Sequence, residues 1–551
     1  MKNVITLAHK THDVLNQPPP FEGHDLFSTD RILEEALVRE GAAWARESIA
    51  ELSRVLTGEP LLWGVQANTH PPVLRNYDRY GNRIDEVEYH PAYHQLMALA
   101  VAHELHALPW RRQQPGAHVA RAAKFFLESQ VEAGHGCPIS MTYSIVPAIR
   151  HQPEIAAEWE PRIVSTEYDP RSLPPNQKRG VICGMAMTEK QGGSDVRANT
   201  TRAEPVDSGG PGAAYWITGH KWFCSAPMSD AFLMLAYTDK GLSCFFVPRW
   251  RPDGVRNTIL IQRLKDKLGN RSNASSEIEL DRAWGRMVGE EGRGVRTIIE
   301  MVNHTRLDCV IGSAAIMRQA LVQAIHHCRH RSAFGKRLVE QPLMQNVLAD
   351  LCLESEAATV AMMRLARAYD MAHRNPEERA FARLATAVVK YWVCKRTPMM
   401  VAEALECLGG AGYVEESVMP RLYREAPLNG IWEGSGNVIC LDVLRAIRKE
   451  PETVPAFFQE VGLAQGEPAL DRAIREVEEE LNQLDDSEFR ARRLVERMAV
   501  VLQSSLLLRH SVPEVAQAFC RSRLEGDGGR AFGTLPRGIR VQSIIERNLP
   551  A

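Results

Sequence analysis

The carboxylate best placed for chemistry in this 551-residue chain is Glu433, in the sequence GIWEGSGN at residues 430–437. It stands between a tryptophan and a Gly-Ser-Gly turn, after the helical pattern RLYREAPL. A carboxylate can remove a proton from a weak carbon acid when its site is dry and the neighbouring carbonyl is polarised. The octapeptide alone fits a surface acid beside a flexible loop equally well, so its meaning depends on the rest of the chain.

A second polar segment is GMAMTEKQGGSDV at residues 184–196. Thr188 and Ser194 supply hydroxyls, and Gly192-Gly193 lets the backbone approach a planar or anionic ligand closely. No Gly-Lys-Ser/Thr follows, which excludes a P-loop, and no G-x-G-x-x-G fingerprint stands after a strand. A polar strand-to-loop connection without a ligand is the alternative interpretation.

An aromatic ring and a hydroxyl lie close together in GHKWFCSAPMSD, residues 219–230. The segment is predicted to be a strand, whose alternation places Phe223 and Ser225 on one face and Trp222 on the other. A ring beside a hydroxyl could cover an isoalloxazine and hydrogen-bond its polar edge. An aromatic side chain in the core is the alternative.

Three histidines, His326, His327 and His330, fall within about one helical turn, a spacing that could bind zinc. A solvated helix face is the favoured interpretation. We therefore predict no metal site.

Several arginines near the C-terminus could contact phosphates; they are Arg490, Arg492, Arg493, Arg497, Arg521 and Arg523. Residues 449–551 nevertheless hold 14 Lys and Arg against 17 Asp and Glu, a net charge of −3. This is not the basic footprint of an autonomous DNA-binding domain. A solvated helix face or a subunit contact is favoured, and DNA binding would require patches from several subunits to combine.

Length and composition limit the number of domains and the class of protein that this chain can form. With 551 residues, 44% hydrophobic and 24% charged, the chain is predicted to be a soluble protein of two to four domains. A formal net charge of −2 gives no global attraction to nucleic acid or to an anionic membrane. The eleven cysteines are odd in number and include no C-x-x-C pair, which favours reduced thiols. Because we find neither a secretory signal nor an apolar run of about 18 residues, we expect a cytoplasmic protein without a membrane span.

The elements that must position these residues change in character along the chain. Helical periodicity dominates residues 1–180, where Ser28-Thr29-Asp30 supplies possible N-caps and THPPVLRNYDRYGNR is predicted to be a loop. Short strands such as AFLMLAYT and LSCFFVP, separated by Gly-rich turns, follow in residues 181–289 and favour a small antiparallel sandwich or barrel. We therefore predict an N-terminal helical domain (1–180) and a middle β-domain (181–289).

Long apolar stripes return after residue 290 and predict an antiparallel helix bundle. One stripe is Val310, Ala314, Met317, Leu321, Ala324 and Cys328. Pro398 falls inside a later helical pattern that ends at Gly409-Gly410, so that pattern is one kinked helix or two helices. We predict a four-helix bundle over 290–448 and an additional helical domain over 449–551, which gives a multidomain, mainly α, α+β protein.

Five segments, taken in order, resemble the motifs of the acyl-CoA dehydrogenase superfamily. The segments are MTEKQGGSD (187–195), KWFCS (221–225), RSAFG (331–335) with Gln341, LGGAGY (408–413) and YREAPLNGIWEGS (423–435). The resemblance implies that superfamily's fold, an FAD cofactor, a homotetramer and an acyl-CoA substrate. It also implies that Glu433 removes the α-proton of an acyl thioester while a hydride passes to the flavin.

The resemblance assigns the remaining site residues as well. Thr188 and Ser225 would hydrogen-bond the flavin ring, and Arg331, Phe334, Gln341 and Gly409-Gly410 would hold the pyrophosphate and adenosine across a subunit interface. The full set of implied FAD contacts is Met185, Met187, Thr188, Gly193, Ser194, Phe223, Ser225, Arg331, Phe334, Gln341, Gly409, Gly410, Tyr423, Ile431, Trp432, Gly434, Ser435 and Asn437.

Within the superfamily the chain looks most like the AidB branch, the flavoproteins of the adaptive response to DNA alkylation. NQPPP near residue 17, RLKDKLGNRSNAS (263–275), CLDVLR (440–445) and the extra C-terminal region carry this resemblance. It implies double-stranded DNA binding that involves Arg445, protection against or action on alkylation damage, and weak dehydrogenase activity. Three departures from the superfamily's motifs concern the acyl-CoA pocket more than the flavin site. They are Phe223 in place of a usual Trp, Lys190 in place of Pro, and the polar segment NRSNAS.

Three functions therefore stay open on the sequence. The chain could be an AidB-type flavoprotein on DNA, a metabolic acyl-CoA dehydrogenase with Glu433 as its base, or a flavin-containing assembly protein with a vestigial pocket. All three share the fold and the cofactor.

Overall fold

The computed structural model describes residues 11–483 and 486–550. Its N-terminal part is a layer of helices, and Asp30 begins it as the N-cap of α1 by accepting a hydrogen bond from the Leu33 amide at 3.1 Å. The helices are α1 (Arg31–Arg39), α2 (Arg46–Leu56), α3 (Glu59–Thr69), α4 (Pro91–Ala102), α5 (Leu108–Arg111), α6 (Ala117–Val131), α7 (Gly136–Ile149) and α8 (Pro153–Ile163), with the 3-10 turns η1 (Ala43–Ala45) and η2 (Pro175–Gln177). Residues 1–10 lie outside the described part. They are the first half of residues 1–20, where the sequence shows no secretory signal.

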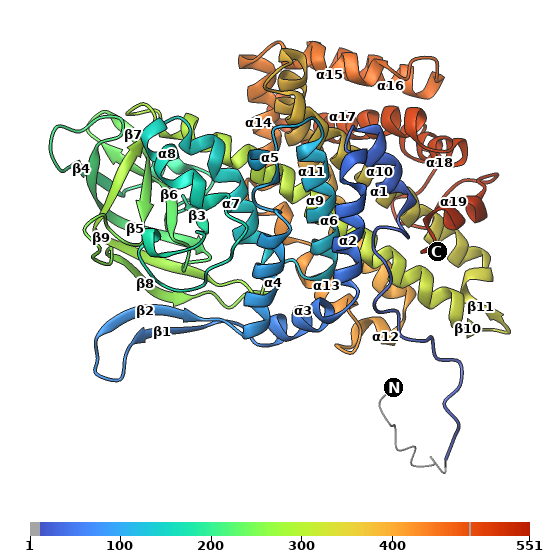
Figure 1. Cartoon of the computed structure of the whole chain (residues 1–551). Helices are drawn as coiled ribbons and strands as arrows, with labels where there is room; N and C mark the ends of the chain where they lie inside the picture. Colours follow the sequence, from blue (N-terminus) through green and yellow to red (C-terminus); the bar gives the residue numbers. More distant parts are fainter. Residues whose placement is uncertain (1–10, 484–485, 551) are drawn as a thin grey trace.

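The predicted loop THPPVLRNYDRYGNR is instead an antiparallel hairpin of β1 (Val73–Tyr77) and β2 (Arg83–Glu88). Figure 1 shows it extending beneath the β-domain. The Asn76 amide donates to the Ile261 carbonyl at 2.8 Å, and Val87 packs into the β-domain core. A tertiary contact thus stabilises strands in a segment whose Pro, Gly and Asn content resembles a loop.

The β-domain closes into a barrel-like sheet of β3 (Cys183–Ala186), β4 (Arg202–Pro205), β5 (Ala214–Ser225), β6 (Ala231–Thr238), β7 (Gly241–Pro248), β8 (Ile259–Leu264) and β9 (Ser275–Val288). Its order is β3-β6-β4-β5-β9-β7, and a pairing of β6 with β7 closes the circuit. Most pairings are antiparallel as predicted, but β6 runs parallel to both β3 and β4. The 3-10 turn η3 (Val196–Ala198) follows β3.

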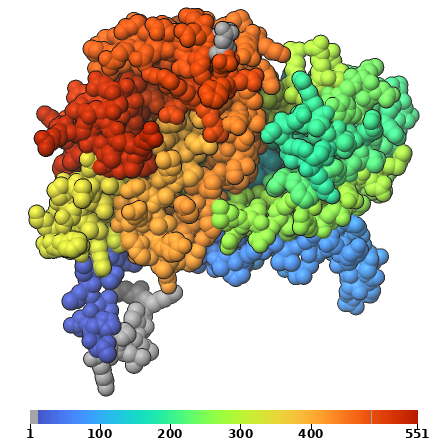
Figure 2. All heavy atoms as spheres, turned by 180° about the vertical axis from the view of Figure 1, so that it is seen from behind, coloured from blue at the N-terminus to red at the C-terminus, as the bar shows by residue number. Residues whose placement is uncertain are grey.

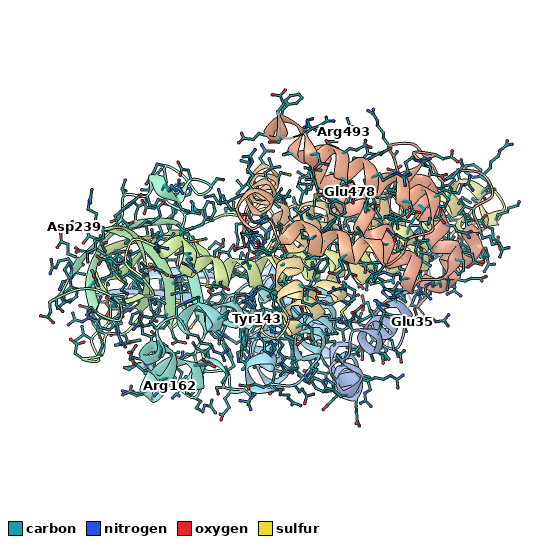
Figure 3. The ribbon with its side chains drawn as sticks, turned by 90° about the horizontal axis from the view of Figure 1, so that it is seen from above. Glu35, Tyr143, Arg162, Asp239, Glu478 and Arg493 are labelled. Atoms are coloured by element: carbon teal, nitrogen blue, oxygen red, sulfur yellow. The ribbon has the colours of Figure 1, made fainter. Side chains whose placement is uncertain are left out.

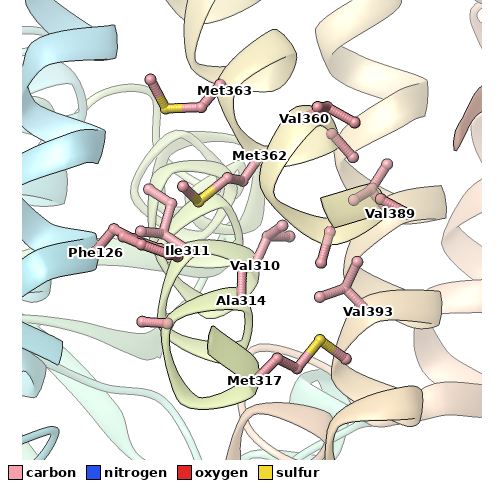
Figure 4. Close-up of a cluster of buried hydrophobic side chains, with 14 of the residues drawn as sticks. Phe126, Val310, Ile311, Ala314, Met317, Val360, Met362, Met363, Val389 and Val393 are labelled. Carbon is pink, nitrogen blue, oxygen red and sulfur yellow. The ribbon is translucent and has the colours of Figure 1, made fainter. Parts of the chain in front are cut away.

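The helix bundle consists of α9 (Gly294–His330), α10 (Pro342–Met371), α11 (Pro376–Cys407) and α14 (Gly436–Lys449). Shorter elements connect these helices: β10 (Ser332–Ala333), β11 (Lys336–Arg337), η4 (Leu338–Glu340), α12 (Gly410–Tyr413), α13 (Met419–Glu425) and η5 (Leu428–Gly430). Figure 4 shows Val310, Ala314 and Met317 of the predicted stripe on α9 among the side chains of neighbouring helices. Pro398 lies inside α11, which is a single helix.

The C-terminal part adds α15 (Thr453–Gly462), α16 (Pro468–Asn482), α17 (Ser487–His510), α18 (Pro513–Phe519), the π-turn η6 (Cys520–Leu524) and α19 (Val541–Asn548). Residues 484 and 485 of the predicted additional helical domain lie outside the described part. All eleven cysteines are buried free thiols. Within the described ranges, no helix has the length and apolar character that a membrane crossing requires.

Candidate active site

Glu433 lies in the turn between η5 and α14, with a φ of 58°. This left-handed conformation costs a residue other than glycine roughly 1–3 kcal/mol, so its surroundings must hold it. Lys390 of α11 donates its Nζ to the carbonyls of Trp432 at 2.9 Å and Gly434 at 2.6 Å. Arg306 of α9 donates its Nε to the carbonyl of Glu433 at 3.0 Å. Two cations from the bundle therefore fix three successive carbonyls, and with them the direction of the Glu433 side chain.

The carboxyl group of Glu433 is enclosed, although the residue as a whole is half-buried. Its Oε2 atom is buried and has no hydrogen-bond partner among the described residues. Burial raises the pKa of this carboxyl, while a hydrogen bond from Thr305 and the charges of Lys390 and Arg306 oppose the rise. A poorly solvated carboxylate with a free oxygen is a stronger base than an exposed one.

Trp432, next to this carboxylate, joins the bundle to the β-domain. Its Nε1 donates to Asn429 Oδ1 at 2.8 Å, and the Asn429 amide donates to Ser313 Oγ of α9 at 3.1 Å. The ring packs against the cluster that contains Met185 and the half-buried Met187. The polar segment after β3 and the Glu433 turn therefore approach each other between the two domains.

The polar segment after β3 forms a tight turn anchored by a buried ion pair. Lys221 Nζ donates to the Glu189 carboxylate at 2.9 Å, and the Trp222 amide donates to the Thr188 carbonyl at 2.8 Å. A side chain at Gly193 would place its Cβ 2.9 Å from Thr188, so only glycine lets the turn fold back this closely. Thr188 is thereby held beside β5.

At the end of β5, Phe223 is 49% exposed and Ser225 is half-buried, whereas Cys224 between them is fully buried. The predicted alternation therefore holds at this end of the strand. The register of β5 against β9 shifts between Lys221 and Cys224, and this bulge re-aims the following side chains. A ring and a hydroxyl thus share one open face, as the sequence analysis expects.

The donors at this face suit a flavin ring. Within the described part of the chain, the hydroxyls of Thr188, Ser194 and Ser435 form no hydrogen bond. The side-chain Oδ1 of Asn437 already accepts from Arg492 Nε at 2.7 Å. Free hydroxyls on the segments after β3 and before α14, with an exposed aromatic ring near the end of β5, match the polar edge and the flat face of an isoalloxazine. The residues present therefore fit FAD.

A second group of predicted FAD contacts lies on the hairpin that follows α9. Phe334 and Gly335 form its two-residue tip with φ of 52° and 78°, and Phe334 is fully exposed. Gln341 supports the hairpin by donating to the Ala333 carbonyl at 3.1 Å. No contact among residues 11–483 and 486–550 explains a completely exposed Phe on a left-handed backbone, so the ring suits a surface from elsewhere.

The two groups are too far apart to hold one FAD within a single chain. Thr305, beside Glu433, and Arg331 are 26 positions apart along α9, which corresponds to about 39 Å. Gly409 (φ 59°) and Gly410 lie at the distant end, and a Cβ on either would meet only open space. A cofactor that uses both groups therefore requires a second copy of the chain.

The N-terminal segment contacts this distant group, which the sequence analysis did not foresee. Asn16 exchanges two hydrogen bonds with the Ser332 backbone at 2.8 Å each, and the Arg331 guanidinium donates to the Asn16 carbonyl at 2.5 Å. Figure 2 shows this segment, in dark blue, leaving the body of the molecule beside the hairpin region. The pattern NQPPP carries no local signal for such a contact.

Two further predicted residues lie outside the enclosed region. Tyr423 is 49% exposed and Ile431 is 63% exposed. Tyr413 (81%) and Leu343 (84%) are also exposed. Apolar side chains exposed to this degree on adjoining elements suit a contact with another surface rather than with the ring of their own chain.

Most of the arginines considered for phosphate contact are engaged in ion pairs. Arg497 pairs with Glu476, Arg521 with Asp527 and Arg523 with Asp350. Arg490 donates to Glu480 at 3.2 Å. Arg445 is 63% exposed, 3.9 Å from Asp442, and Arg493 is exposed at the outer end of α17 (Figure 3). Arg445 and Arg493, together with the exposed Arg492 that hydrogen-bonds Asn437, form no close ion pair with the described residues and remain available for a phosphate.

The three histidines do not form a zinc site. His326 Nε2 hydrogen-bonds the Pro19 carbonyl at 2.9 Å, and its ring stacks on Phe21 at 4.3 Å. His330 Nδ1 hydrogen-bonds the His326 carbonyl. Across residues 11–483 and 486–550, no group of three or more His, Cys, Asp or Glu is arranged to hold a metal. The helix face binds the N-terminal segment instead.

A cavity of about 600 Å³ opens on another face of α9. His304 and Tyr369 line it, whereas none of the predicted site residues does. Arg383 and Glu450 in its wall pair with each other at 2.9 Å. Because cations and carboxylates both line this cavity, its charge selects no ligand class.

The residues that the sequence analysis missed are those that hold Glu433 in place, namely Thr305, Arg306 and Lys390. Lys390 did leave a signal, since it interrupts the apolar run TAVVKYWV inside a helix. A lysine in such a run must be paired when it is buried. Its partners are backbone carbonyls, which no sequence pattern identifies.

Three family models match the chain. The AidB N-terminal domain matches residues 16–170, the acyl-CoA dehydrogenase middle domain matches 184–283, and the acyl-CoA dehydrogenase C-terminal domain matches 292–448.

Individual relatives agree with these models. AidB of Escherichia coli (strain K12) is 46% identical over 544 residues, which cover 98% of each chain. The solved structure of Caenorhabditis elegans ACDH-11 in complex with C11-CoA is 27% identical, with a TM-score of 0.85 over 95% of each chain. The structure named Bd2924 apo-form is 28% identical, with a TM-score of 0.82 over 91% of this chain and 100% of that one. The resemblance and the fold class expected from the sequence are thereby confirmed, and the chain belongs to the AidB-type members of the acyl-CoA dehydrogenase family.

Proposed function

We propose that the chain is an FAD-dependent oxidoreductase in which Glu433 removes the α-proton of an acyl thioester. One observation carries this proposal: the Glu433 carboxyl is enclosed, with a buried oxygen that has no hydrogen-bond partner among the described residues. Membership of the acyl-CoA dehydrogenase family gives the class of enzyme, and FAD is its cofactor. The identity of the base and the residues that bind the cofactor are the added steps.

The chain's own groups supply everything except the hydride acceptor. We assign Thr188, Ser194 and Ser225 to the polar edge of the ring, and Phe223 with Trp432 to its flat surroundings. When bound, FAD accepts the hydride that leaves the β-carbon of the substrate.

Glu433 takes the α-proton on its free oxygen. The backbone N–H of Glu433 donates to no atom in the described residues, so it is available to polarise the thioester carbonyl. The surrounding protein keeps water from the carboxylate, which raises its basicity and protects the separated charges.

The substrate class is proposed to be an acyl-CoA. ACDH-11, which shares 95% of its length with this fold, has been solved with C11-CoA. A second copy of the chain is proposed to complete the cofactor site through Arg331, Phe334, Gln341, Gly409 and Gly410, and a homotetramer is the assembly we expect.

An anaerobic titration of the FAD-loaded protein with a series of acyl-CoAs tests this proposal. The flavin absorbance should bleach with at least one chain length. Glu433→Gln should slow bleaching by about 10²–10⁴-fold, because a general base is lost, and should leave FAD bound. Glu416→Gln, a change at an exposed glutamate between α12 and α13, is the matched control. Bleaching of the Glu433→Gln protein at the wild-type rate would show that Glu433 is not the base.

Double-stranded DNA binding, with protection against or action on alkylation damage, is a second candidate function. It is supported by exposed cations on two helices that pack against each other: Arg445, Arg448 and Lys449 on α14 and Arg493 on α17. These helices are joined where Arg448 donates to Ser487 Oγ at 2.7 Å. Phosphate contacts made by several copies of such a patch would offset the acidic balance of the C-terminal region.

A salt titration of duplex affinity separates this function from the first. Binding should weaken as salt rises, and Arg445→Gln combined with Arg493→Gln should reduce the slope. Arg540→Gln, which removes an exposed cation elsewhere in the C-terminal region, should not. The DNA function fails if no binding occurs at about 50 mM salt, or if affinity does not depend on salt.

A further inference from the structure

A half-buried lysine that the proposed reaction does not use is linked to Ser225 through Ser275. Lys267 belongs to the loop between β8 and β9 and is half-buried. Its Nζ donates to the Asn273 carbonyl at 2.6 Å and to Ser275 Oγ at 3.0 Å. The loop and the first residue of β9 contain the polar segment NRSNAS (270–275), which departs from the superfamily's usual motif.

Ser275 passes this contact on to Ser225. The β5–β9 register pairs the two residues directly, and their Oγ atoms are 3.2 Å apart. A lysine ammonium is only a donor, so Ser275 Oγ accepts from Lys267 and its own hydrogen is free to point at Ser225. With Ser275 as the donor, Ser225 accepts this bond and keeps its single hydrogen for another acceptor. The two acceptors on offer are the neighbouring Cys137 sulfur and the ring that is placed against Ser225.

The relay is set among buried ionisable groups from three neighbouring elements. Burial lowers the pKa of Lys267 to about 8, and the charges of Cys137 on α7, Glu425 on α13 and Glu132 after α6 oppose this effect. Burial, with the nearby charge of Glu132, raises the pKa of Glu425 to about 7. At neutral pH Lys267 therefore carries a proton, which it loses as the pH rises through about 8.

The loop is held tightly in this position. The Asn270 amide donates to the Glu425 carboxylate at 2.5 Å, and the Ser272 hydroxyl donates to Glu132 at 2.9 Å. Gly134 has no side chain, and a Cβ there would lie 1.9 Å from Ser272 Oγ. The loop that carries Lys267 is therefore fitted closely against the ends of α6 and α13, so its ammonium has a defined place.

We propose that Lys267 is a positioning residue for the flavin: through Ser275 it fixes the Ser225 hydroxyl as a donor, and its charge makes the ring easier to reduce. The inference rests on the proposed placement of FAD against Ser225. Lys267 lies two hydrogen bonds from Ser225 and therefore three from the ring, and a cation in this position stabilises the electron-rich reduced ring more than the oxidised one.

Reductive titration of the FAD-loaded protein against a reference dye measures the effect as a midpoint potential at pH 7. Lys267→Met should shift the equilibrium about tenfold towards the oxidised flavin, which for a two-electron couple is about 30 mV more negative. Lys267→Arg should restore most of this difference. Arg271→Gln, which removes an exposed cation of the same loop, should leave the potential unchanged. The wild-type potential should also change its pH slope near pH 8, and Lys267→Met should lose that change.

Ser275→Ala keeps the lysine and removes the relay, so it provides a second test if Lys267→Met does not fold. It should also make the potential more negative. The inference is overturned if neither Lys267→Met nor Ser275→Ala changes the potential while Ser225→Ala alters the flavin spectrum. If Ser225→Ala also leaves the spectrum unchanged, the proposed placement of FAD is what fails.

Discussion

Glu433 combines three features that each destabilise the folded chain. Its backbone is left-handed, its carboxyl is withdrawn from water, and one carboxyl oxygen has no partner in the described residues. A base for a weak carbon acid requires the last two features, and the contacts from Lys390 and Arg306 stabilise the first. We interpret the turn as a site whose local strain is maintained by the bundle.

The first prediction concerns pH. Burial raises the pKa of Glu433, so the protonated, inactive form persists to a higher pH than for an exposed glutamate. The rate of flavin reduction by an acyl-CoA should therefore rise with pH along an acid limb whose midpoint lies above the usual glutamate value. Stopped-flow absorbance at saturating substrate measures this limb. A rate that is flat across the range would contradict the assignment.

Lys390→Met gives a second prediction. The charge of Lys390 favours the ionised form of Glu433, so its removal should raise the pKa and move the acid limb to higher pH. Loss of two carbonyl contacts should also slow reduction by about 10-fold even at high pH, since the base is no longer held in place. Arg379→Gln, an exposed cation in the first turn of the same helix, is the control. A limb that stays in place would remove Lys390 from this role.

At the residue scale, the sequence identifies the groups that carry chemistry better than those that orient them. The prediction of Glu433 as a base came from the family resemblance, through its register with Tyr423 and Arg424 and with the four upstream motifs. Lys390, Arg306 and Lys267 act on backbone carbonyls or a serine, and such contacts leave no spacing in the sequence because their partners are distant along the chain.

At the scale of elements, α9 determines the layout of the site. Its first third contacts the Glu433 turn, and its C-terminus carries the β10–β11 hairpin. The hairpin tip places Phe334 on a left-handed backbone with its ring fully exposed. An exposed ring of this size at the tip of a hairpin suits contact with another surface.

Phe334→Ser tests the role of the hairpin. The change should weaken both FAD retention and self-association, because the exposed ring is proposed to meet a second copy or its cofactor. Thermal unfolding of the chain itself should change little, since Phe334 is fully exposed. Phe489→Ser replaces another exposed phenylalanine, 93% exposed at the start of α17, and serves as the control. Wild-type FAD content and sedimentation of the Phe334→Ser protein would contradict the prediction.

The order of elements could be predicted because helix and strand periodicities differ along the chain. The β1–β2 hairpin could not, because its strands are stabilised by the β-domain rather than by their own composition. The continuity of α11 through Pro398 was likewise undecided from sequence. A proline inside a helix is tolerated when tertiary packing supplies the stabilisation that the local chain loses.

At the scale of the whole molecule, the C-terminal region is part of the main core. One buried cluster contains Phe126 of α6, Val310 of α9, Leu506 of α17 and Ile544 of α19. Arg318 of α9 also donates to the Asn548 carbonyl at 3.1 Å. The predicted division at residue 449 therefore marks a change in sequence character, whereas the packing is continuous.

Arg547→Gln tests how far the last helix stabilises the molecule. Arg547 is almost buried and pairs with Glu356 at 3.0 Å and with Glu35 at 2.6 Å, which links α19 to α10 and α1. Its removal would leave Glu356 fully buried without its cation, which costs about 3–5 kcal/mol. Burial already raises the pKa of Glu356, and loss of Arg547 would raise it further. Below that pKa the acid is protonated and the cost is avoided, so the destabilisation should grow as the pH rises from about 5 to 8.

Arg540→Gln removes an exposed pair with Glu514 and should change stability by less than about 1 kcal/mol at either pH. Chemical denaturation at the two pH values decides: equal stability of the Arg547→Gln and Arg540→Gln proteins would mean that α19 does not support the bundle.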